Sequence, residues 1–300
     1  MIVVVGSLNM DLVTQVKKTP KVGETTLGNG LDKIPGGKGA NQAAAMGKLN
    51  GKVAMIGRVG EDEFGKILKD TLNKDDINTE YIMISKSPTG VAMIMVNEDG
   101  DNSIVVIPGA NFDLSKKDID EAKALIKTAN ILVAQLETPL EVVEYALKKA
   151  KKFEKYTILN PAPAQKLSKE IIEYVDLLTP NESELELLSG VEIKSEEDLL
   201  RAGKVMIQQG VKELVVTLGD KGALYMNEKD HKYFKGYKVK AVDTTAAGDS
   251  VNGALAVALD EGRTIDEAII FAMKVGALTV MEKGAQSSLP TLEKVEKYFK

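Results

Sequence analysis

The side chains available for chemistry are restricted, because the 300-residue chain has no cysteine and a single histidine, His231. It therefore cannot supply a thiolate nucleophile, a Ser-His-Asp triad, a Cys/His zinc site, an iron–sulfur cluster or a disulfide framework. Any catalysis has to use carboxylates, lysine, hydroxyl groups and the backbone.

The most informative segment is DTTAAGDS at residues 243–250. Small residues there lead from a turn into a predicted helix, whose N-terminal N–H groups and positive dipole end can bind an oxyanion or a phosphoryl group. Asp249 falls in the first turn of that helix, where it could take the proton from a hydroxyl nucleophile. The alternative is that Asp243 and Thr244 form a turn and Asp249 only offsets the helix dipole.

A second glycine cluster, GGKGANQAAA at residues 36–45, also runs from a loop into a small-residue helix. Lys38 and Asn41 are three residues apart, so both can face one polar ligand. The alternative is a tight turn before a core helix, with Lys38 in solvent. By contrast, GEDEFGKI at residues 60–67 is rejected as a Walker A phosphate loop, because it carries three acidic residues and ends in Ile67 where Ser or Thr is needed.

Three further segments end at polar groups. In TPNESE (residues 179–184), Thr179 as N-cap and Glu182 at N3 predict a capping box, which leaves Asn181 and Glu184 to orient a triphosphate or metal-bound water. Glu137 follows a predicted strand at its ligand-binding end. TLGDKG (residues 217–222) is equally typical of a plain β-turn.

Short β-branched runs alternate with segments of helical period, which predicts an α/β fold with a central, mostly parallel sheet flanked by helices. Ligands of such sheets bind at the carboxyl ends of the strands. The predicted strands are 2–5, 53–56, 131–134, 156–159, 175–178 and 214–218, with a hairpin near 223–234. The predicted helices are 41–49, 63–72, 116–127, 139–152, 196–209, 249–260, 265–281 and 292–299.

Residues 12–34 and 91–107 break this alternation and predict a small β-sheet lid on a body formed by residues 1–11, 35–90 and 108–300. In the 91–107 hairpin, which turns around Asp99-Gly100, both sets of alternating positions are apolar, so both faces need cover. One face would lie over the active site, and we expect the other to pack on a second subunit.

The charge pattern gives no sign of a polymer partner. The net charge is -5, from 39 basic and 44 acidic residues that are well mixed, so we expect neither nucleic acid nor a membrane surface as partner. No apolar stretch approaches the roughly 20 residues of a membrane span, and the start lacks a basic signal region. We therefore expect a cytoplasmic enzyme.

Taken in order, these segments resemble the ribokinase-like family of sugar and nucleoside kinases along nearly the whole chain. The matching segments are NMD (9–11), GGKGANQA (36–43), GRVGEDEFG (57–65), QLE (135–137), NPAPA (160–164), PNESE (180–184), TLGDKG (217–222), DTTAAGDS (243–250) and KGAQSSLP (283–290). The resemblance implies ATP-dependent phosphorylation of D-ribose on its 5-hydroxyl.

The resemblance also implies roles for particular residues. Asp249 would be the catalytic base, and the backbone of Ala246, Ala247 and Gly248 the anion hole. The sugar would be held by Asp11, Gly37, Lys38, Asn41 and Glu137, with Asn9 close by. Asn181, Thr217, Gly219 and Gly248 would contact ATP, and Glu184 would organise magnesium-bound water.

Members of this family are also activated by potassium, so the resemblance implies a K⁺ ion beside the anion-hole loop. Its ligands would be the side chains of Asp243 and Ser288 and the carbonyl groups of Thr245, Thr279 and Gly284, an oxygen set suited to a hard cation. The lid would close over the sugar and form a homodimer.

Two positions depart from the family pattern. Val251 replaces a common phenylalanine, and Met273 stands where a polar residue often approaches adenine, so the choice of nucleotide base stays open. A nucleoside kinase or another sugar kinase of the same fold is the main alternative, although no aromatic residue lies near Asp11 or in residues 36–43 to stack on a base. A silent binding protein would be expected to lack Asp249 or the glycine of the anion hole.

Overall fold

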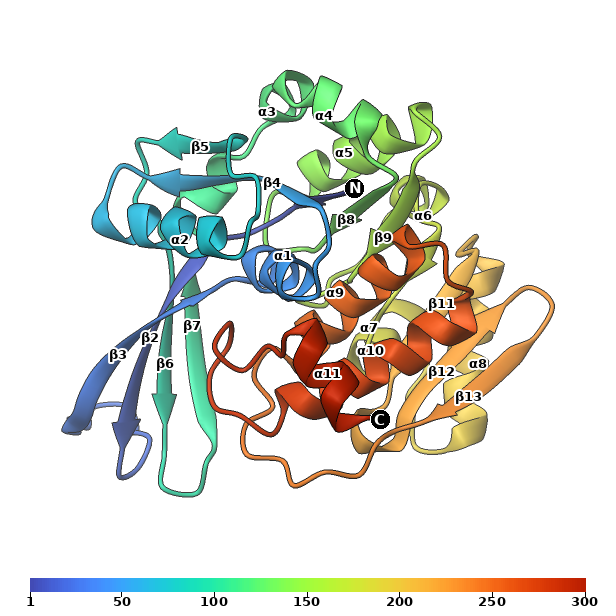
Figure 1. Ribbon diagram of the computed structural model, residues 1–300. Helices are drawn as coiled ribbons and strands as arrows, with labels where there is room; N and C mark the ends of the chain where they lie inside the picture. The colour runs from blue at the N-terminus through green and yellow to red at the C-terminus, as the bar shows by residue number, and fades with distance from the viewer.

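The computed structural model describes residues 1–300 and has a nine-stranded sheet at its centre, in the order β13-β12-β11-β10-β9-β8-β1-β4-β5 (Figure 1). All neighbouring strands from β11 to β5 run parallel, and β12 and β13 add an antiparallel edge. The strands are β1 (Ile2–Val5), β4 (Val53–Gly60), β5 (Ile82–Ser85), β8 (Ile131–Ala134), β9 (Tyr156–Leu159), β10 (Leu177–Leu178), β11 (Glu213–Thr217), β12 (Gly222–Asn227) and β13 (His231–Lys235).

Helices cover both faces of this sheet because its central strands are apolar on both sides. Ile2 and Val4 belong to one core cluster, and Val3 and Val5 belong to the other. The first cluster is completed by α1 (Lys38–Lys48), α2 (Glu63–Lys74), α9 (Ala247–Asp260), α10 (Ile265–Thr279) and α11 (Leu292–Tyr298). The second is completed by α3 (Lys116–Glu121), α4 (Lys123–Thr128), α5 (Leu140–Lys152), α6 (Lys169–Glu173), α7 (Glu182–Ser189) and α8 (Glu196–Gln208).

A separate four-stranded sheet, the lid sheet, projects from this body (Figure 1). Its order is β3-β2-β6-β7, formed by β3 (Gly28–Gly36), β2 (Asn9–Val16), β6 (Gly90–Val96) and β7 (Asn102–Ile107). The expected hairpin is present, with Gly100 at φ 86° in its turn. Side chains alternate across the sheet, so Asp11 and Ala92 share one face while Leu12 and Met93 share the other.

Two local expectations were wrong. The helix expected over residues 116–127 is divided at Ala122, whose dihedral angles (φ −81°, ψ 10°) end α3. The capping box of α7 is formed two residues later than expected, by Asn181 and Glu184. Thr179 does not cap the helix because its hydroxyl is buried, where it donates to Asn252 Oδ1 at 2.5 Å.

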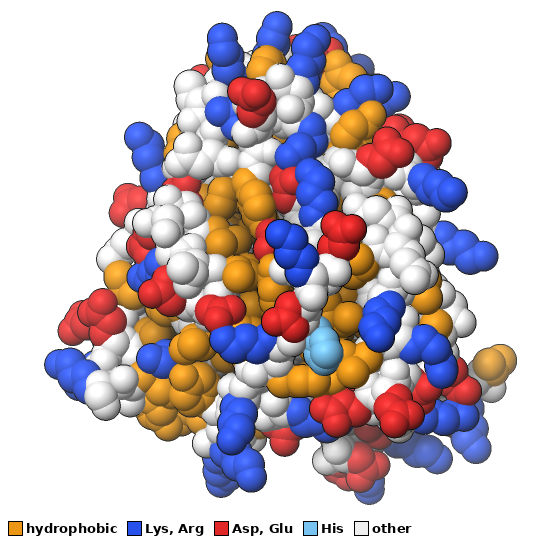
Figure 2. Space-filling view, turned by 90° about the vertical axis from the view of Figure 1, so that its right-hand side faces the viewer, with side chains coloured by type: hydrophobic (Ala, Val, Ile, Leu, Met, Phe, Trp, Pro, Cys, Tyr) orange, Lys and Arg blue, Asp and Glu red, His pale blue; other side chains and the backbone are white.

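Charges of both signs are mixed on the face shown in Figure 2, with hydrophobic side chains visible between them. None of the helices has the length and apolar character needed to cross a bilayer.

Candidate active site

Asp249 lies in the first turn of α9 and is buried, with 7% of its surface exposed. Its carboxylate accepts one hydrogen bond on each oxygen, from Asn41 Nδ2 at 3.0 Å and from Gln42 Nε2 at 3.1 Å. Both donors belong to α1, which packs on α9 so closely that a Cβ atom on Gly253 would lie 2.7 Å from that of Ala45. The small residues noted in both helices thus bring the predicted base to two amide donors.

The loop before Asp249 presents free backbone donors. Ala246 is the N-cap of α9 in the left-handed conformation (φ 58°, ψ 9°), a strained conformation for a residue other than glycine and one that recurs at functional sites. The N–H groups of Ala246, Gly248 and Asp249 have no acceptor, whereas that of Ala247 donates to Thr244 O at 3.2 Å. One of the three expected anion-hole donors is therefore engaged, and the N–H of Asp249 adds an unexpected free one. This arrangement can hold a phosphoryl group.

The residues expected to bind the sugar come together beside Asp249. Glu137, in the loop after β8, accepts from Ser7 Oγ at 2.5 Å and from the backbone N–H of Lys38 at 3.1 Å. Gly36 faces the Asp11 carboxyl group, because a Cβ atom there would lie 2.3 Å from Asp11 Oδ2. Gly37 adopts φ 90° at the N-cap of α1, a conformation that glycine tolerates.

Asn9 plays a different part from the other predicted sugar ligands. It is buried, and its Oδ1 accepts from Asn111 Nδ2 at 2.7 Å. Asn111 also bonds both the N–H and the carbonyl group of Leu8. The Asn9 side chain thus helps to fix the start of β2, the strand that carries Asp11.

The charges in this region are unbalanced, because Lys38 is surrounded by Asp249, Glu137, Glu184 and Asp11. Burial is the largest single influence on Lys38 and lowers its pKa, but the four carboxyl groups together outweigh it and raise the pKa. Burial, reinforced by Glu137 and Asp249, raises the pKa of Asp11 to about 7. Burial likewise raises the pKa of Asp249, against the opposing effects of Lys38, Asn41 and Gln42.

A polar cavity of about 220 Å³ extends from Asp249 past Lys38, Gly248 and Thr217 to Asn181 and Glu184. Asn181 and Glu184 bond to each other's backbone N–H, both at 2.8 Å, through Asn181 Oδ1 and Glu184 Oε2. Asn181 Nδ2 and Glu184 Oε1 make no hydrogen bond and remain available to a ligand. Burial raises the pKa of Glu184, which suits a carboxylate that gains stability when it binds a cation.

This polar cavity adjoins a larger and more apolar one of about 550 Å³, with which it shares Thr217 and Gly248. Gly219 (φ 60°) lines this cavity, and so do the apolar side chains of Val251, Met273 and Tyr237. Their size and character suit a planar base, while the polar cavity suits phosphates.

The predicted potassium ligands lie on three segments that meet behind the anion-hole loop. Asp243 Oδ1 accepts from the N–H of Thr245 at 2.9 Å, and its Oδ2 accepts from the N–H of Gly284 at 2.9 Å. Asp243 N and Val280 O pair at 3.2 Å, which brings the end of α10, with Thr279, to the same place. Ser288 follows Gly284 by four residues. It is buried, and its hydroxyl donates to Ala285 O. The oxygen-rich set is compatible with a hard monovalent cation.

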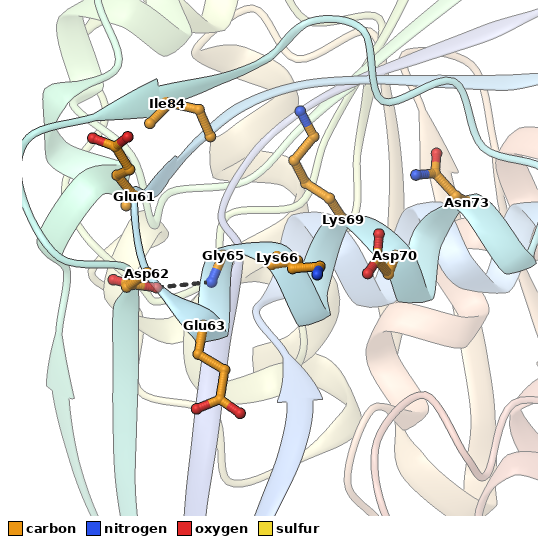
Figure 3. A pocket seen from close by; sticks show the side chains of 10 residues that line it. Glu61, Asp62, Glu63, Gly65, Lys66, Lys69, Asp70, Asn73 and Ile84 are labelled. Atoms are coloured by element: carbon orange, nitrogen blue, oxygen red, sulfur yellow. Dashed lines mark hydrogen bonds between the residues drawn. The ribbon is translucent and has the colours of Figure 1, made fainter.

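The rejected loop at residues 60–67 forms a separate pocket beside the start of α2 (Figure 3). Asp62 caps that helix by accepting from Gly65 N at 2.8 Å, and its other oxygen accepts from Thr89 N. Lys66 and Lys69 also line the pocket, but the acidic side chains of Glu61, Asp62 and Glu63 lie at the helix start itself, which therefore does not suit a phosphate group.

Several residues at the site were not assigned roles from the sequence, namely Ser7, Gln42, Gln135, Asn160 and Asn252. All five are buried and hydrogen-bonded within or beside the cavity. A signal did exist for Gln42, because a large amide in a helix otherwise made of small, buried residues needs polar partners in the interior.

Comparison with known proteins shows which family this chain is similar to. The model of the pfkB carbohydrate kinase family matches residues 1–292. The chain is 42% identical over 297 residues to ribokinase of Haemophilus influenzae, covering 99% of this chain and 97% of the relative. It is 38% identical over 300 residues to deoxyribokinase of Salmonella typhi, covering 99% and 98%. The structure of Arabidopsis thaliana ribokinase complexed with ribose and ATP superposes with a TM-score of 0.92 at 33% identity, covering 100% of this chain and 98% of that one.

Proposed function

The chain belongs to the pfkB family of carbohydrate kinases, and on this premise we propose that it transfers the γ-phosphoryl group of ATP to the 5-hydroxyl of D-ribose. The products are D-ribose 5-phosphate and ADP. The observation that carries the proposal is the buried Asp249 carboxylate beside free N–H groups at the start of α9, between a polar cluster and a base-sized apolar cavity.

In this reaction Asp249 removes the proton of the 5-hydroxyl as its oxygen attacks the γ-phosphorus. The bond from that phosphorus to the β,γ-bridging oxygen breaks, and ADP leaves with the electron pair. The N–H groups of Ala246, Gly248 and Asp249 face the negative charge on the transferring group.

Sugar recognition is assigned to Asp11, Lys38, Asn41 and Glu137, with the backbone at Gly37. A polyol is discriminated by paired donors and acceptors, since a sugar that lacks one hydroxyl leaves a buried polar group of the protein unpaired. The Oδ1 atom of Asn41 is buried without a partner, so it can accept a hydrogen bond from a sugar hydroxyl.

The nucleotide is assigned to Asn181, Thr217, Gly219 and Gly248. Magnesium would be held through water by Glu184 and would neutralise phosphate charge when bound. Potassium would be held by Asp243 and Ser288 and the carbonyl groups of Thr245, Thr279 and Gly284, where it would support the shape of the anion-hole loop. Val251 and Met273 form part of an apolar base slot that does not by itself select adenine over guanine.

We also propose that residues 12–34 and 91–107 act as a lid that closes over ribose, and that the lid sheet forms a homodimer. Five apolar side chains of its β6–β7 hairpin are about half exposed: Met93 52%, Ile104 51%, Val105 58%, Val106 47% and Ile107 44%. Met93, Val105 and Ile107 lie on one face of the sheet, and Ile104 and Val106 lie on the other. Exposed apolar side chains on a projecting sheet are typical of an interface.

The alternatives are other substrates of the same chemistry. The relative named deoxyribokinase makes 2-deoxyribose a specific second candidate. A nucleoside is less well supported, because none of the residues that line the polar cavity is aromatic.

The test is an ADP-release assay with ATP and magnesium that compares D-ribose with 2-deoxyribose, adenosine and fructose 6-phosphate. Potassium is either present or replaced by a bulky organic cation. Ribose-dependent turnover, with NMR of the product placing phosphate on the 5-oxygen, supports the proposal. Higher kcat/KM for 2-deoxyribose or adenosine would keep Asp249 as the base but overturn the assigned substrate.

A further inference from the structure

We propose that Gln42 is a positioning residue for catalysis, whose side-chain amide holds the Asp249 carboxylate in the orientation in which it accepts the sugar proton. This inference rests on the proposed function, because it assigns Gln42 a role in the same phosphoryl transfer.

The contacts of Gln42 support this role. The side chain is fully buried in α1, where its Nε2 donates to Asp249 Oδ1 and to Asn160 Oδ1, both at 3.1 Å. Its Oε1 accepts from Gln135 Nε2 at 2.7 Å. Each hydrogen-bonding atom of the Gln42 amide is therefore engaged, and the amide cannot rotate without breaking contacts.

The direction of these hydrogen bonds follows from the charge on Asp249. An ionised carboxylate only accepts, so Gln42 has to present its NH₂ group to Asp249 and its oxygen to Gln135. Asn160 then has to present its oxygen to Gln42, and its own NH₂ group donates to Thr179 O at 3.0 Å. The amides of Gln42, Gln135 and Asn160 thus form one hydrogen-bonded network that reaches the carboxylate through Gln42.

The one unpaired atom of this network, Gln135 Oε1, lies away from the Asp249 carboxylate. Gln135 Oε1 is buried without a partner, on the side of Gly6, where a Cβ atom would lie only 2.2 Å away. The unpaired oxygen follows from the donor direction, because Gln135 has to turn its NH₂ group to Gln42 Oε1 once Gln42 donates to Asp249.

Asn41 and Gln42 together define how the carboxylate is presented. Asn41 Nδ2 donates to Oδ2 and Gln42 Nε2 donates to Oδ1, so each carboxylate oxygen keeps acceptor capacity for the substrate. Asp249 lines the polar cavity, where that capacity can be used. Asn41 is also a candidate sugar ligand, because its Oδ1 has no partner. The amide of Gln42 is engaged by protein groups alone, so Gln42 acts only through Asp249.

The charged groups that face Asp249 are Lys38 on α1, Glu137 after β8, Asp11 on β2 and Glu184 on α7. The three other carboxyl groups and burial favour a protonated Asp249. Lys38 and the two amides oppose them and favour the ionised base. Loss of the Gln42 amide therefore moves the pKa of Asp249 upward.

The experiment compares wild type, Gln42→Met and Gln135→Met in kcat and kcat/KM against pH, with ribose binding measured separately by calorimetry. Methionine keeps the length and volume of glutamine but donates no hydrogen bond. Leu49→Ala, a buried change at the end of α1, is the control for general destabilisation.

For Gln42→Met we expect kcat at pH 7 to fall about 10- to 100-fold, since a misplaced catalytic group commonly costs this much. The acidic limb of the plot of kcat against pH should move up by about one pH unit, and ribose affinity should change less than kcat. Gln135→Met should change kcat and the acidic limb in the same direction, but by less. If Gln42→Met does not fold, Gln135→Met provides the test. The inference is overturned if the limb and the high-pH kcat of the folded variants match those of Leu49→Ala. If wild type prefers another sugar, the proposed substrate fails, but the same profiles taken with that sugar still decide the role of Gln42.

Discussion

Asn41 Nδ2 lies 3.0 Å from Asp249 Oδ2, although 208 residues separate them in the chain. The contact exists because α1 and α9 approach each other at Gly253, where no side chain keeps them apart. A candidate sugar ligand and the candidate base therefore form one unit, and the helix that orients the base is also the one proposed to bind the sugar.

Replacement of Asp249 by asparagine should reduce kcat by about 10²- to 10⁴-fold, the usual effect of removing a general base. Asparagine has the same shape, so we expect the variant to fold and to bind ribose. Steady-state ADP release measures the loss, and calorimetry measures the binding. Asp99→Asn, in the exposed hairpin turn, serves as the control. Turnover within a fewfold of wild type would remove Asp249 from the mechanism.

The binding of ribose should depend on pH through Asp11. Burial raises the pKa of this carboxyl group to about 7 in the empty protein, whereas sugar hydroxyl groups donate to its ionised form. Ribose affinity should therefore fall as pH drops below about 7, by about tenfold at pH 6. Calorimetric titrations at pH 6 and pH 8 measure this, and Asp11→Asn should bind ribose more weakly with little pH dependence. An unchanged pH dependence in that variant would contradict the assignment.

The same pKa shift makes a stability prediction with a definite sign. The folded pKa of Asp11 is above its ordinary value of 3.8, so ionisation of Asp11 destabilises the fold progressively as pH rises from 3.8 to about 7. Asp11→Asn should therefore raise the free energy of unfolding at pH 8, by about 2 to 4 kcal/mol, and have little effect near pH 4. Urea unfolding at the two pH values tests this, and equal effects at both would show that charge is not the cause.

The proposed cation site leads to a prediction about the loop rather than about the chemistry. Burial of Asp243 raises its pKa, but hydrogen bonds from Thr245 and Gly284 outweigh burial and lower it, so the group stays ionised across the range of activity. Replacing potassium by tetramethylammonium at constant ionic strength should reduce kcat about 5- to 100-fold, the range expected for an effector on a neighbouring loop. Asp243→Asn should show low activity with either cation. If Asp243→Asn responds to potassium as wild type does, the ion binds elsewhere.

Much of the architecture could be predicted because short-range patterns determine it. The all-apolar run at residues 2–5 predicted a strand buried on both faces, and the parallel sheet that follows is confirmed. The capping box was placed wrongly because Thr179 and Asn181 are both good N-cap residues, and local sequence does not reveal that Thr179 is held by Asn252 from α9. The network of Gln42, Gln135 and Asn160 could not be predicted, because it joins one helix to the loops after β8 and β9, which meet only in the folded chain.

The lid sheet should make the protein a dimer, and a charged side chain placed in that interface should dissociate it. Ile104 and Val105 point to opposite faces of the sheet, and Asp11 marks the face toward the active site as that of Ile104. The face of Val105 and Met93 is therefore the one expected to meet a second subunit, and Val105→Asp would bury an unpaired carboxylate there. We expect wild type to be a dimer at micromolar concentration by light scattering, and Val105→Asp to be a monomer.

The control is Ile270→Asp, an equally apolar and 43% exposed position on α10 of the body, which should leave the dimer intact. If Ile104→Asp dissociates the dimer and Val105→Asp does not, the interface uses the opposite face, and the partner's lid then lies near the sugar. A wild-type protein that stays monomeric at high concentration would contradict the interface altogether. In that case the exposed apolar hairpin would have to be covered by the body when the lid closes, and ribose should protect its amides from hydrogen exchange.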